Sequence, residues 1–211
     1  MSKNVVIIDY GLGNIFSLFQ ACEYVGYNVE ITSDPDKLIK ADALILPGVG
    51  AFGNAIETLG NNDLINPIIE FVNTGKPFLG ICLGMQLLFT QSEEFGNHKG
   101  LNLIEGQIIK FPEFEINYKF RVPQIQWNKI FAKDNFNWDE TPFKGIDDGE
   151  YMYFVHSYYA LPRDESVVLS YTEYANIKYA SSVVKENILG IQFHPEKSSA
   201  QGLKIFRDWL K

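Results

Sequence analysis

The chain has 211 residues, of which 46% are hydrophobic and 21% charged, and its formal net charge is −8. This length and balance suit one globular domain with a sizeable core and exclude a disordered chain. The excess negative charge argues against binding nucleic acid through a basic face, and no apolar run approaches the ~18 residues that a membrane helix needs.

The start of the chain and its two cysteines indicate the cellular compartment. Met1 to Asn4 lead directly into the apolar run at Val5, without the charged head and long apolar stretch of a secretory signal. We therefore expect a cytoplasmic protein that crosses no membrane and keeps Cys22 and Cys82 as free thiols.

Short apolar runs alternate with helical patterns through the first half of the chain. Asp34 and Pro35 form a typical helix start, and Gly75 stands where a helix should end. Predicted strands are 5–9, 28–32, 43–46 and 78–81; predicted helices run to about 26, from 34, from about 51, over 63–73 and over 83–89. This alternation predicts a parallel sheet covered by helices on both faces.

The second half has a different pattern. From Leu103 to about Val184 it is rich in Tyr, Phe, Val and Ile separated by short turns, which predicts antiparallel strands. One more buried strand is predicted over 188–193 and a closing helix over 198–211. We therefore expect a single α/β domain over residues 1–211, with a mostly parallel central sheet flanked by helices and an antiparallel extension.

The segment around Cys82 is the most informative part of the sequence. Cys82 follows a predicted strand, precedes a predicted helix, and has glycines two residues before and after it, at Gly80 and Gly84. This spacing is typical of a nucleophile elbow, a sharp turn in which only glycine leaves room for the crowded backbone. The alternative is a buried core cysteine, which is our interpretation of Cys22 on its helical stretch.

A reactive thiolate at Cys82 needs a histidine partner. A helix dipole contributes only ~0.3–1 kcal/mol, whereas an imidazolium about 4 Å away contributes about 4 kcal/mol at an effective dielectric near 20. Of the three histidines, His194 ends a predicted buried strand and is followed by Pro195 and Glu196. In an extended segment, residues two apart project to the same side, so Glu196 is expected to fix the ring of His194.

The sequence therefore predicts a nucleophile, a base and an orienting carboxylate at Cys82, His194 and Glu196. Because the carboxyl ends of parallel strands lie at one edge of a sheet, Cys82 and His194 can meet there. His156 is interpreted as structural.

Three segments resemble class I glutamine amidotransferases: GICLGMQ at 80–86, LPGVGAF at 46–52 and FHPEK at 193–197. Within that family, DYGLGN at 9–14, SEE at 92–94 and HSY at 156–158 are similar to the members of the histidine pathway. The resemblance extends from residue 5 to about residue 210.

The resemblance implies a role for each matching residue. Cys82 would attack the side-chain amide of glutamine, with the N–H groups of Leu83 and Val49 holding the oxyanion. Val49 lies between Gly48 and Gly50, and these glycines allow its peptide to flip; a plain strand-to-helix turn is the alternative. The implied glutamine-binding residues are Gly50, Gln86, Glu94, Ser157 and Tyr158. The resemblance calls for neither a cofactor nor a metal.

The same resemblance implies a heterodimer with a (β/α)₈-barrel cyclase that receives the ammonia. Tyr10, Gly13 and Asn14 lie in the segment similar to the family's docking surface, and Trp127 matches an aromatic residue near the ammonia exit. Residues 124–126 differ from the usual pattern of the histidine pathway. A paralogous barrel for amidation of surface sugars is therefore an alternative partner.

Two further hypotheses belong to other functional classes. One is a catalytically idle binding subunit, against which the complete set of Cys82, His194 and Glu196 argues. The other is a cysteine hydrolase for a different amide, which leaves the glutamine-recognition residues unexplained.

Overall fold

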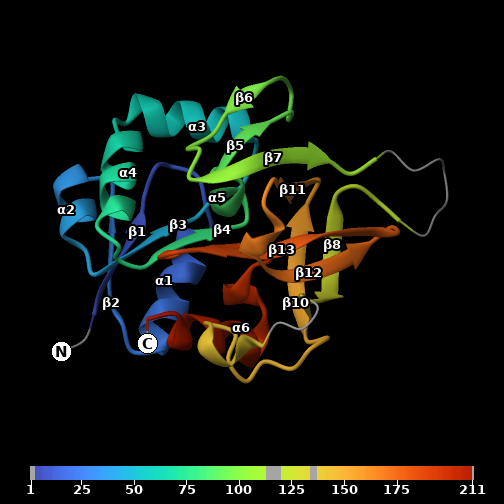
Figure 1. The fold of residues 1–211 in the computed structure, drawn as a ribbon. Helices are drawn as coiled ribbons and strands as arrows, with labels where there is room; N and C mark the ends of the chain where they lie inside the picture. The colour runs from blue at the N-terminus through green and yellow to red at the C-terminus, as the bar shows by residue number, and fades with distance from the viewer. Residues whose placement is uncertain (1–2, 113–119, 134–136, 211) are drawn as a thin grey trace.

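A computed structural model gives the fold, and it describes residues 3–112, 120–133 and 137–210. Among these residues a twelve-stranded sheet runs through the molecule (Figure 1). Five of its strands, in the order β2-β1-β3-β4-β14, are parallel. They are β1 (Asn4–Ile8), β2 (Asn28–Thr32), β3 (Ala43–Leu46), β4 (Phe78–Ile81) and β14 (Ile188–Ile191).

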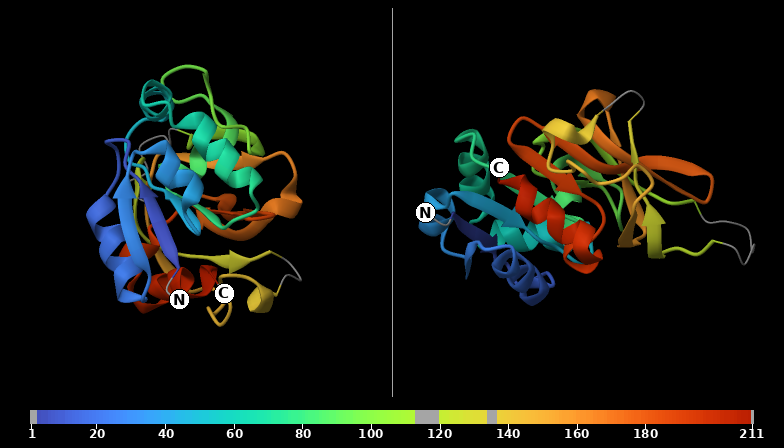
Figure 2. Two further views of the ribbon diagram at one scale, coloured as in Figure 1. Left: turned by 90° about the vertical axis from the view of Figure 1, so that its left-hand side faces the viewer. Right: turned by 90° about the horizontal axis from the view of Figure 1, so that it is seen from below.

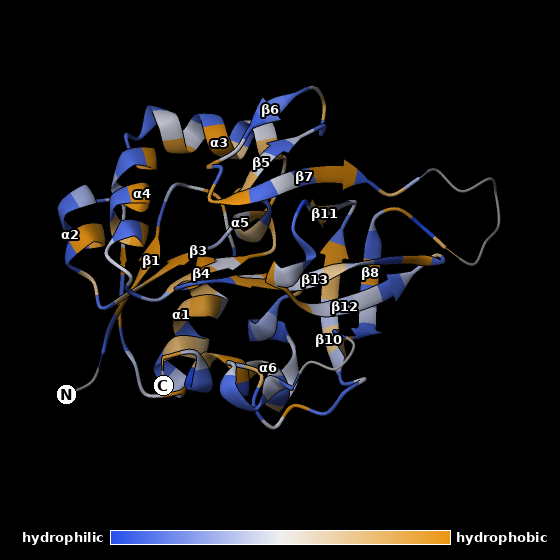
Figure 3. Ribbon diagram, viewed as in Figure 1, coloured by the Kyte–Doolittle hydropathy of each residue, from blue (hydrophilic) through white to orange (hydrophobic). Residues whose placement is uncertain are grey.

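Helices cover both faces of this parallel part, as expected (Figures 1 and 2). One apolar cluster packs against α2 (Pro35–Lys40), α3 (Phe52–Asn61) and α4 (Ile65–Asn73). The opposite cluster packs against α1 (Ile15–Tyr24) and α6 (Ser199–Trp209). Strand β1 shows how the chain builds both layers, because Val6 and Ile8 face the first cluster while Val5 and Ile7 face the second. Figure 3 shows β1 and β3, in the middle of this part of the sheet, as strongly hydrophobic.

The antiparallel extension continues the sheet beyond β14. Its path is β14-β13-β11-β7-β5-β6, with β12 and β9 joined to β13 and a separate pair, β8 and β10, beside it. Their bounds are β5 (Phe89–Ser92), β6 (His98–Lys99), β7 (Ile104–Lys110), β8 (Gln124–Lys129), β9 (Phe131–Ala132), β10 (Tyr151–His156), β11 (Tyr158–Pro162), β12 (Val168–Tyr174) and β13 (Ile177–Lys185). Three short 3₁₀ helices, η1 (Trp138–Glu140), η2 (Glu165–Val167) and η3 (Pro195–Lys197), complete the described structure.

Several local predictions are confirmed. Strands β2, β3 and β4 have the predicted bounds. The Asp34 side chain caps α2 by accepting a hydrogen bond from the Asp36 N–H. Gly75 follows the end of α4 with a φ of +76°. Within the described residues, no helix is both long and apolar enough to span a membrane.

Two predictions need correction. The helix expected over 83–89 is α5 (Leu83–Gln86), because the backbone of Leu87 and Leu88 pairs with Leu101 and Leu103 instead of continuing the helix. The extension also contains one parallel pair, β5 with β7. The closing helix runs from Ser199 to Trp209, and the predicted end at Lys211 lies outside the described residues.

Candidate active site

Cys82 occupies a sharp turn between β4 and α5. Its φ of 54° and ψ of −111° are unusual for a residue with a side chain, and such strain is typical of nucleophile elbows. The backbone N–H of Cys82 donates to the carbonyl of Ile191 at 2.7 Å, which fixes the turn to the end of the neighbouring strand β14. The predicted elbow is therefore confirmed as a backbone geometry.

The two glycines around the elbow are required by close backbone packing. A Cβ on Gly84 would lie 1.9 Å from the carbonyl oxygen of Leu46, and one on Gly80 would lie 2.8 Å from the carbonyl oxygen of Gly84. The turn from β4 into α5 thus presses directly against the end of β3. This contact brings the elbow close to the segment Pro47–Gly50.

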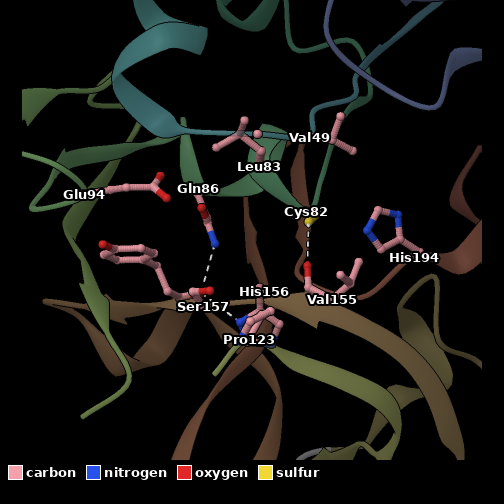
Figure 4. A pocket seen from close by; sticks show the side chains of 12 residues that line it. Val49, Cys82, Leu83, Gln86, Glu94, Pro123, Val155, His156, Ser157 and His194 are labelled. Atoms are coloured by element: carbon pink, nitrogen blue, oxygen red, sulfur yellow. Dashed lines mark hydrogen bonds between the residues drawn. The ribbon is translucent and has the colours of Figure 1, made fainter. Parts of the chain in front are cut away.

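His194 reaches the elbow from the adjacent strand. Because β4 and β14 are parallel neighbours, with Ile81 paired to Ile191, the residues beyond them lie at the same edge of the sheet. The backbone N–H of His194 donates to the carbonyl of Tyr153 at 2.9 Å, and its own carbonyl accepts from the Ser198 hydroxyl at 2.7 Å. Cys82 and His194 both line one pocket (Figure 4).

Glu196 is hydrogen-bonded to His194, but from a different backbone conformation than expected. Its Oε1 lies 2.8 Å from Nδ1 of His194, and both side chains are almost fully buried. Glu196 belongs to the 3₁₀ helix η3, so an extended segment is the wrong description of residues 194–196. With Nδ1 directed at the carboxylate, Nε2 is left without a hydrogen-bond partner among the described residues.

Charge at the site favours a protonated His194. Burial lowers the pKa of His194, but the negative charges of a Cys82 thiolate and of Glu196 outweigh burial and raise that pKa from 6.5 to about 10. The negative charges around His194 therefore favour its imidazolium form. The four-residue helix α5 adds little to this, since a dipole grows from many aligned peptides.

The pocket has a volume of about 250 Å³, suited to a small molecule. Its walls include every residue predicted to bind glutamine or to form the oxyanion hole. These are Val49, Gly50, Leu83, Gln86, Glu94, Ser157 and Tyr158. The Glu94 carboxylate accepts from the Phe52 N–H at 2.6 Å, at the start of α3. Burial raises the pKa of Glu94, while this hydrogen bond and His98 oppose the change.

The two residues interpreted as structural are buried as expected. Cys22 is fully buried on α1, where burial and the nearby Glu196 raise its pKa to about 12. His156 binds the Tyr158 carbonyl through Nδ1 at 2.8 Å and contacts the Tyr179 hydroxyl through Nε2 at 3.2 Å. His156 also lines the pocket, so this structural side chain lies directly behind the site.

The four residues predicted to face a partner lie in different environments. Tyr10 is only 2% exposed, and its hydroxyl donates to the carbonyl of Pro47 at 2.8 Å. Gly13 also packs on Pro47, because a Cβ there would lie 3.2 Å from the proline Cβ. Asn14 precedes α1 and accepts from the Ser17 hydroxyl. Trp127 on β8 is 45% exposed.

Two residues at the site were not predicted from the sequence. Sγ of Cys82 lies 3.8 Å from the carbonyl oxygen of Val155 and 3.8 Å from Nε2 of Gln192. Val155 contributes only backbone, which no sequence pattern marks. Gln192 carries a signal in the sequence, because it is a polar residue in an otherwise apolar run, two positions before His194.

A family model and several curated relatives show the family of this chain. The family model for class I glutamine amidotransferases matches residues 6–211. Imidazole glycerol phosphate synthase subunit HisH from Syntrophotalea carbinolica is 45% identical over 97% of this chain and 98% of that protein. The HisH subunit from Methanosarcina mazei is 47% identical over 99% of this chain and 98% of that protein.

Solved structures resemble the fold at lower sequence identity. A structure of PurLQS from Thermotoga maritima has a TM-score of 0.75 and 19% identity, covering 100% of this chain and 98% of that one. A structure described as a glutamine amidotransferase has a TM-score of 0.72 and 17% identity, covering 97% and 96%. These likenesses concern the fold, which agrees with the mixed sheet expected from the sequence.

Proposed function

The chain belongs to the class I glutamine amidotransferases and, within them, to the HisH subunits of imidazole glycerol phosphate synthase, and we propose that Cys82, His194 and Glu196 release ammonia from glutamine. The observation that carries this proposal is the place of His194, which lines the same pocket as Cys82 while Glu196 holds its Nδ1 and, among the described residues, no group is hydrogen-bonded to its Nε2. We further propose that residues 1–211 form one domain of this family.

The reaction follows from these positions. The Cys82 thiolate attacks the side-chain carbonyl carbon of glutamine, and the N–H groups of Leu83 and Val49 stabilise the oxyanion. His194 donates its Nε2 proton to the departing nitrogen, which leaves as ammonia, and a glutamyl thioester remains on Cys82. His194 then takes a proton from water, the resulting hydroxide attacks the thioester, and glutamate leaves as the thiolate is restored.

Recognition of glutamine is assigned to the polar residues of the pocket wall. Glu94 is the one acidic side chain lining it among the described residues, which suits the α-ammonium group of the substrate. Gln86 is one helical turn after Cys82 and, with Gly50 and the backbone around Ser157 and Tyr158, supplies the remaining polar contacts.

The partner proposed is a (β/α)₈-barrel cyclase of the HisF type, in histidine biosynthesis. Free ammonia at neutral pH is mostly ammonium, which is not a nucleophile. Direct transfer to a bound partner keeps the ammonia in its neutral, nucleophilic form. The docking residues proposed are those around Gly13 and Asn14, together with Trp127. Contact of Tyr10 and Gly13 with Pro47 supports a route from that surface to the Val49 peptide.

The test mixes this chain with the histidine-pathway barrel and its ribonucleotide, and follows glutamate and imidazole glycerol phosphate. We expect slow glutamine hydrolysis alone, strong stimulation by the liganded barrel, and loss of turnover in Cys82→Ala but not in Cys22→Ser. Partner-stimulated ammonia release that persists in Cys82→Ala would overturn the nucleophile assignment. Activity only with a sugar-modifying barrel would replace the partner and keep the glutaminase step.

A glutamine-analogue alkylator separates this function from an idle binding subunit. We expect Cys82 to be labelled in the presence of the partner, with glutamine protecting it. A subunit without catalytic competence would remain unlabelled.

A further inference from the structure

Gln192 is a buried residue that links two parts of the pocket. It follows β14, is fully buried, and stands two residues before His194. Its Oε1 accepts a hydrogen bond from Nε2 of Gln86 at 3.0 Å, and its Nε2 lies 3.8 Å from Sγ of Cys82. One side chain therefore connects the nucleophile to a residue of the substrate pocket.

The direction of these hydrogen bonds is set by a backbone carbonyl. The nitrogen and oxygen of a glutamine amide look alike, and only their partners distinguish them. The carbonyl oxygen of Tyr158 can only accept, so the atom of Gln86 that lies 3.0 Å from it is Nε2. The same Nε2 donates its second hydrogen to Gln192, whose facing atom must be Oε1. Nε2 of Gln192 is consequently the end that faces the sulfur of Cys82.

The sulfur of Cys82 thus lies between a donor and an acceptor. The carbonyl of Val155, at 3.8 Å, accepts from the neutral thiol and repels a thiolate. The amide of Gln192 does the opposite, because an N–H donor favours the charged form of its acceptor. His194 supplies the positive charge for this balance, while Gln192 supplies a directional hydrogen bond.

We propose that Gln192 donates the hydrogen bond that stabilises the Cys82 thiolate before it attacks, and that Gln86 keeps this donor aimed at the sulfur. The inference rests on the proposed role of Cys82 as the nucleophile. It gives Gln86 a second task besides lining the substrate pocket, since both of its amide hydrogens are committed to Tyr158 and Gln192. Its Oε1 is then the atom that remains for the substrate.

The experiment measures the rate at which iodoacetamide alkylates Cys82 in the full chain, by peptide mass spectrometry, as a function of pH. In Gln192→Met we expect the midpoint of this profile to rise by about one pH unit and the rate below the midpoint to fall about tenfold. Gln124→Met is the matched control, because Gln124 is also a fully buried glutamine but is not hydrogen-bonded to Cys82. We expect its profile to match the unmodified chain.

A second measurement does not depend on any change at Gln192. In the ¹⁵N-labelled chain, the side-chain amide of Gln192 should titrate with the same midpoint as the alkylation profile, and this titration should vanish in Cys82→Ala. An unchanged alkylation profile in Gln192→Met would overturn the inference. So would a Gln192 amide signal that does not titrate, or one whose titration persists in Cys82→Ala. Neither measurement uses glutamine or a partner. Failure of glutamine hydrolysis would therefore refute the proposed function while leaving this result intact.

Discussion

At the scale of single residues, His156 is held neutral behind the pocket. Burial lowers its pKa to about 4, against the opposing hydrogen bond to the Tyr158 carbonyl, and His194 lowers it further. The unfolded chain takes up this proton near 6.5, whereas the folded protein takes it up only near 4. The contribution of His156 to stability is therefore complete above about pH 6.5 and is lost as the pH falls toward 4.

This shift gives a testable pH dependence. Wild-type protein should lose up to about 3 kcal/mol more stability than His156→Gln between pH 6.5 and pH 4, because one pKa unit corresponds to about 1.4 kcal/mol. Urea unfolding of both proteins across this range measures the difference in unfolding free energy. Both proteins contain the same carboxylates, so the effect of carboxylate titration cancels in that difference. Parallel stability curves for the two proteins would contradict a neutral, buried His156.

Glu196 illustrates how a correct pairing can rest on a wrong local geometry. The sequence spacing of His194 and Glu196 suggested the contact through an extended strand, but the chain turns into η3 at Pro195. The contact forms because the proline begins the 3₁₀ turn and the carboxylate folds back onto Nδ1. Both conformations bring residues two apart within reach of each other, so the pattern alone could not distinguish them.

At the scale of elements, the elbow depends on close backbone contact between β4, α5 and the end of β3. Gly84→Ala should destabilise the protein by at least about 2 kcal/mol, since its Cβ would overlap the carbonyl oxygen of Leu46. Gly60→Ala is the matched control. Gly60 lies in α3, and a Cβ there would meet only Ile65, at an ordinary contact distance of 3.7 Å. We expect the control to be neutral or up to about 1 kcal/mol more stable.

Thermal and urea unfolding of the two variants make the comparison. Equal stability of Gly84→Ala and the unmodified chain would mean that the elbow can move away from β3. In the expected case, the Cβ added by Gly84→Ala strains the elbow that carries Leu83, so loss of partner-stimulated glutaminase activity should accompany the loss of stability.

The elements that could be predicted from sequence share a physical property. Strands β2, β3 and β4 are bounded by turn residues and lie in a parallel sheet, so apolar runs and their ends were easy to recognise. The run Leu87 to Phe89 was ambiguous because all three side chains are fully buried. A short apolar run fits a helix or a strand equally well, and only long-range pairing with residues 101–104 decides between them.

The site itself was predictable in part for a related reason. Cys82 and His194 each follow a recognisable strand, so the sequence predicts that both lie just beyond strand ends. That β4 and β14 are neighbours follows from the sheet order, which local patterns do not encode. The contact of Gln192 with Cys82 depends on the same neighbourhood, and the carbonyl of Val155 reaches the sulfur from β10 of the separate two-stranded sheet, which no local pattern encodes.

At the scale of the whole molecule, the exposed aromatic residues allow the proposed partner surface to be tested. Trp127 lies on β8 with its ring edge-on to Tyr153, whose strand also carries Val155 of the pocket. Trp127→Ala should weaken binding of the barrel subunit about tenfold or more, as expected for a tryptophan at the centre of an interface. Isothermal titration calorimetry measures this affinity.

Tyr24 provides the control for that measurement. It is 80% exposed at the end of α1. Because α1 returns from the carboxyl end of β1, its last turn lies at the opposite edge of the sheet from Cys82. Tyr24→Ala should bind the barrel with unchanged affinity. If both variants bind alike, the partner does not dock over β8.

The position of β14 has a consequence for how the protein is made. It follows every other strand in the chain, yet it lies in the interior of the sheet, between β4 and β13. A ribosome therefore produces Cys82, the proposed nucleophile, more than a hundred residues before His194, and the edges of β4 and β13 that pair with β14 stay unpaired until it is inserted. Because His194 lies beyond β14, it can reach Cys82 only after β14 is in place, so we expect an unfinished chain not to release ammonia from glutamine.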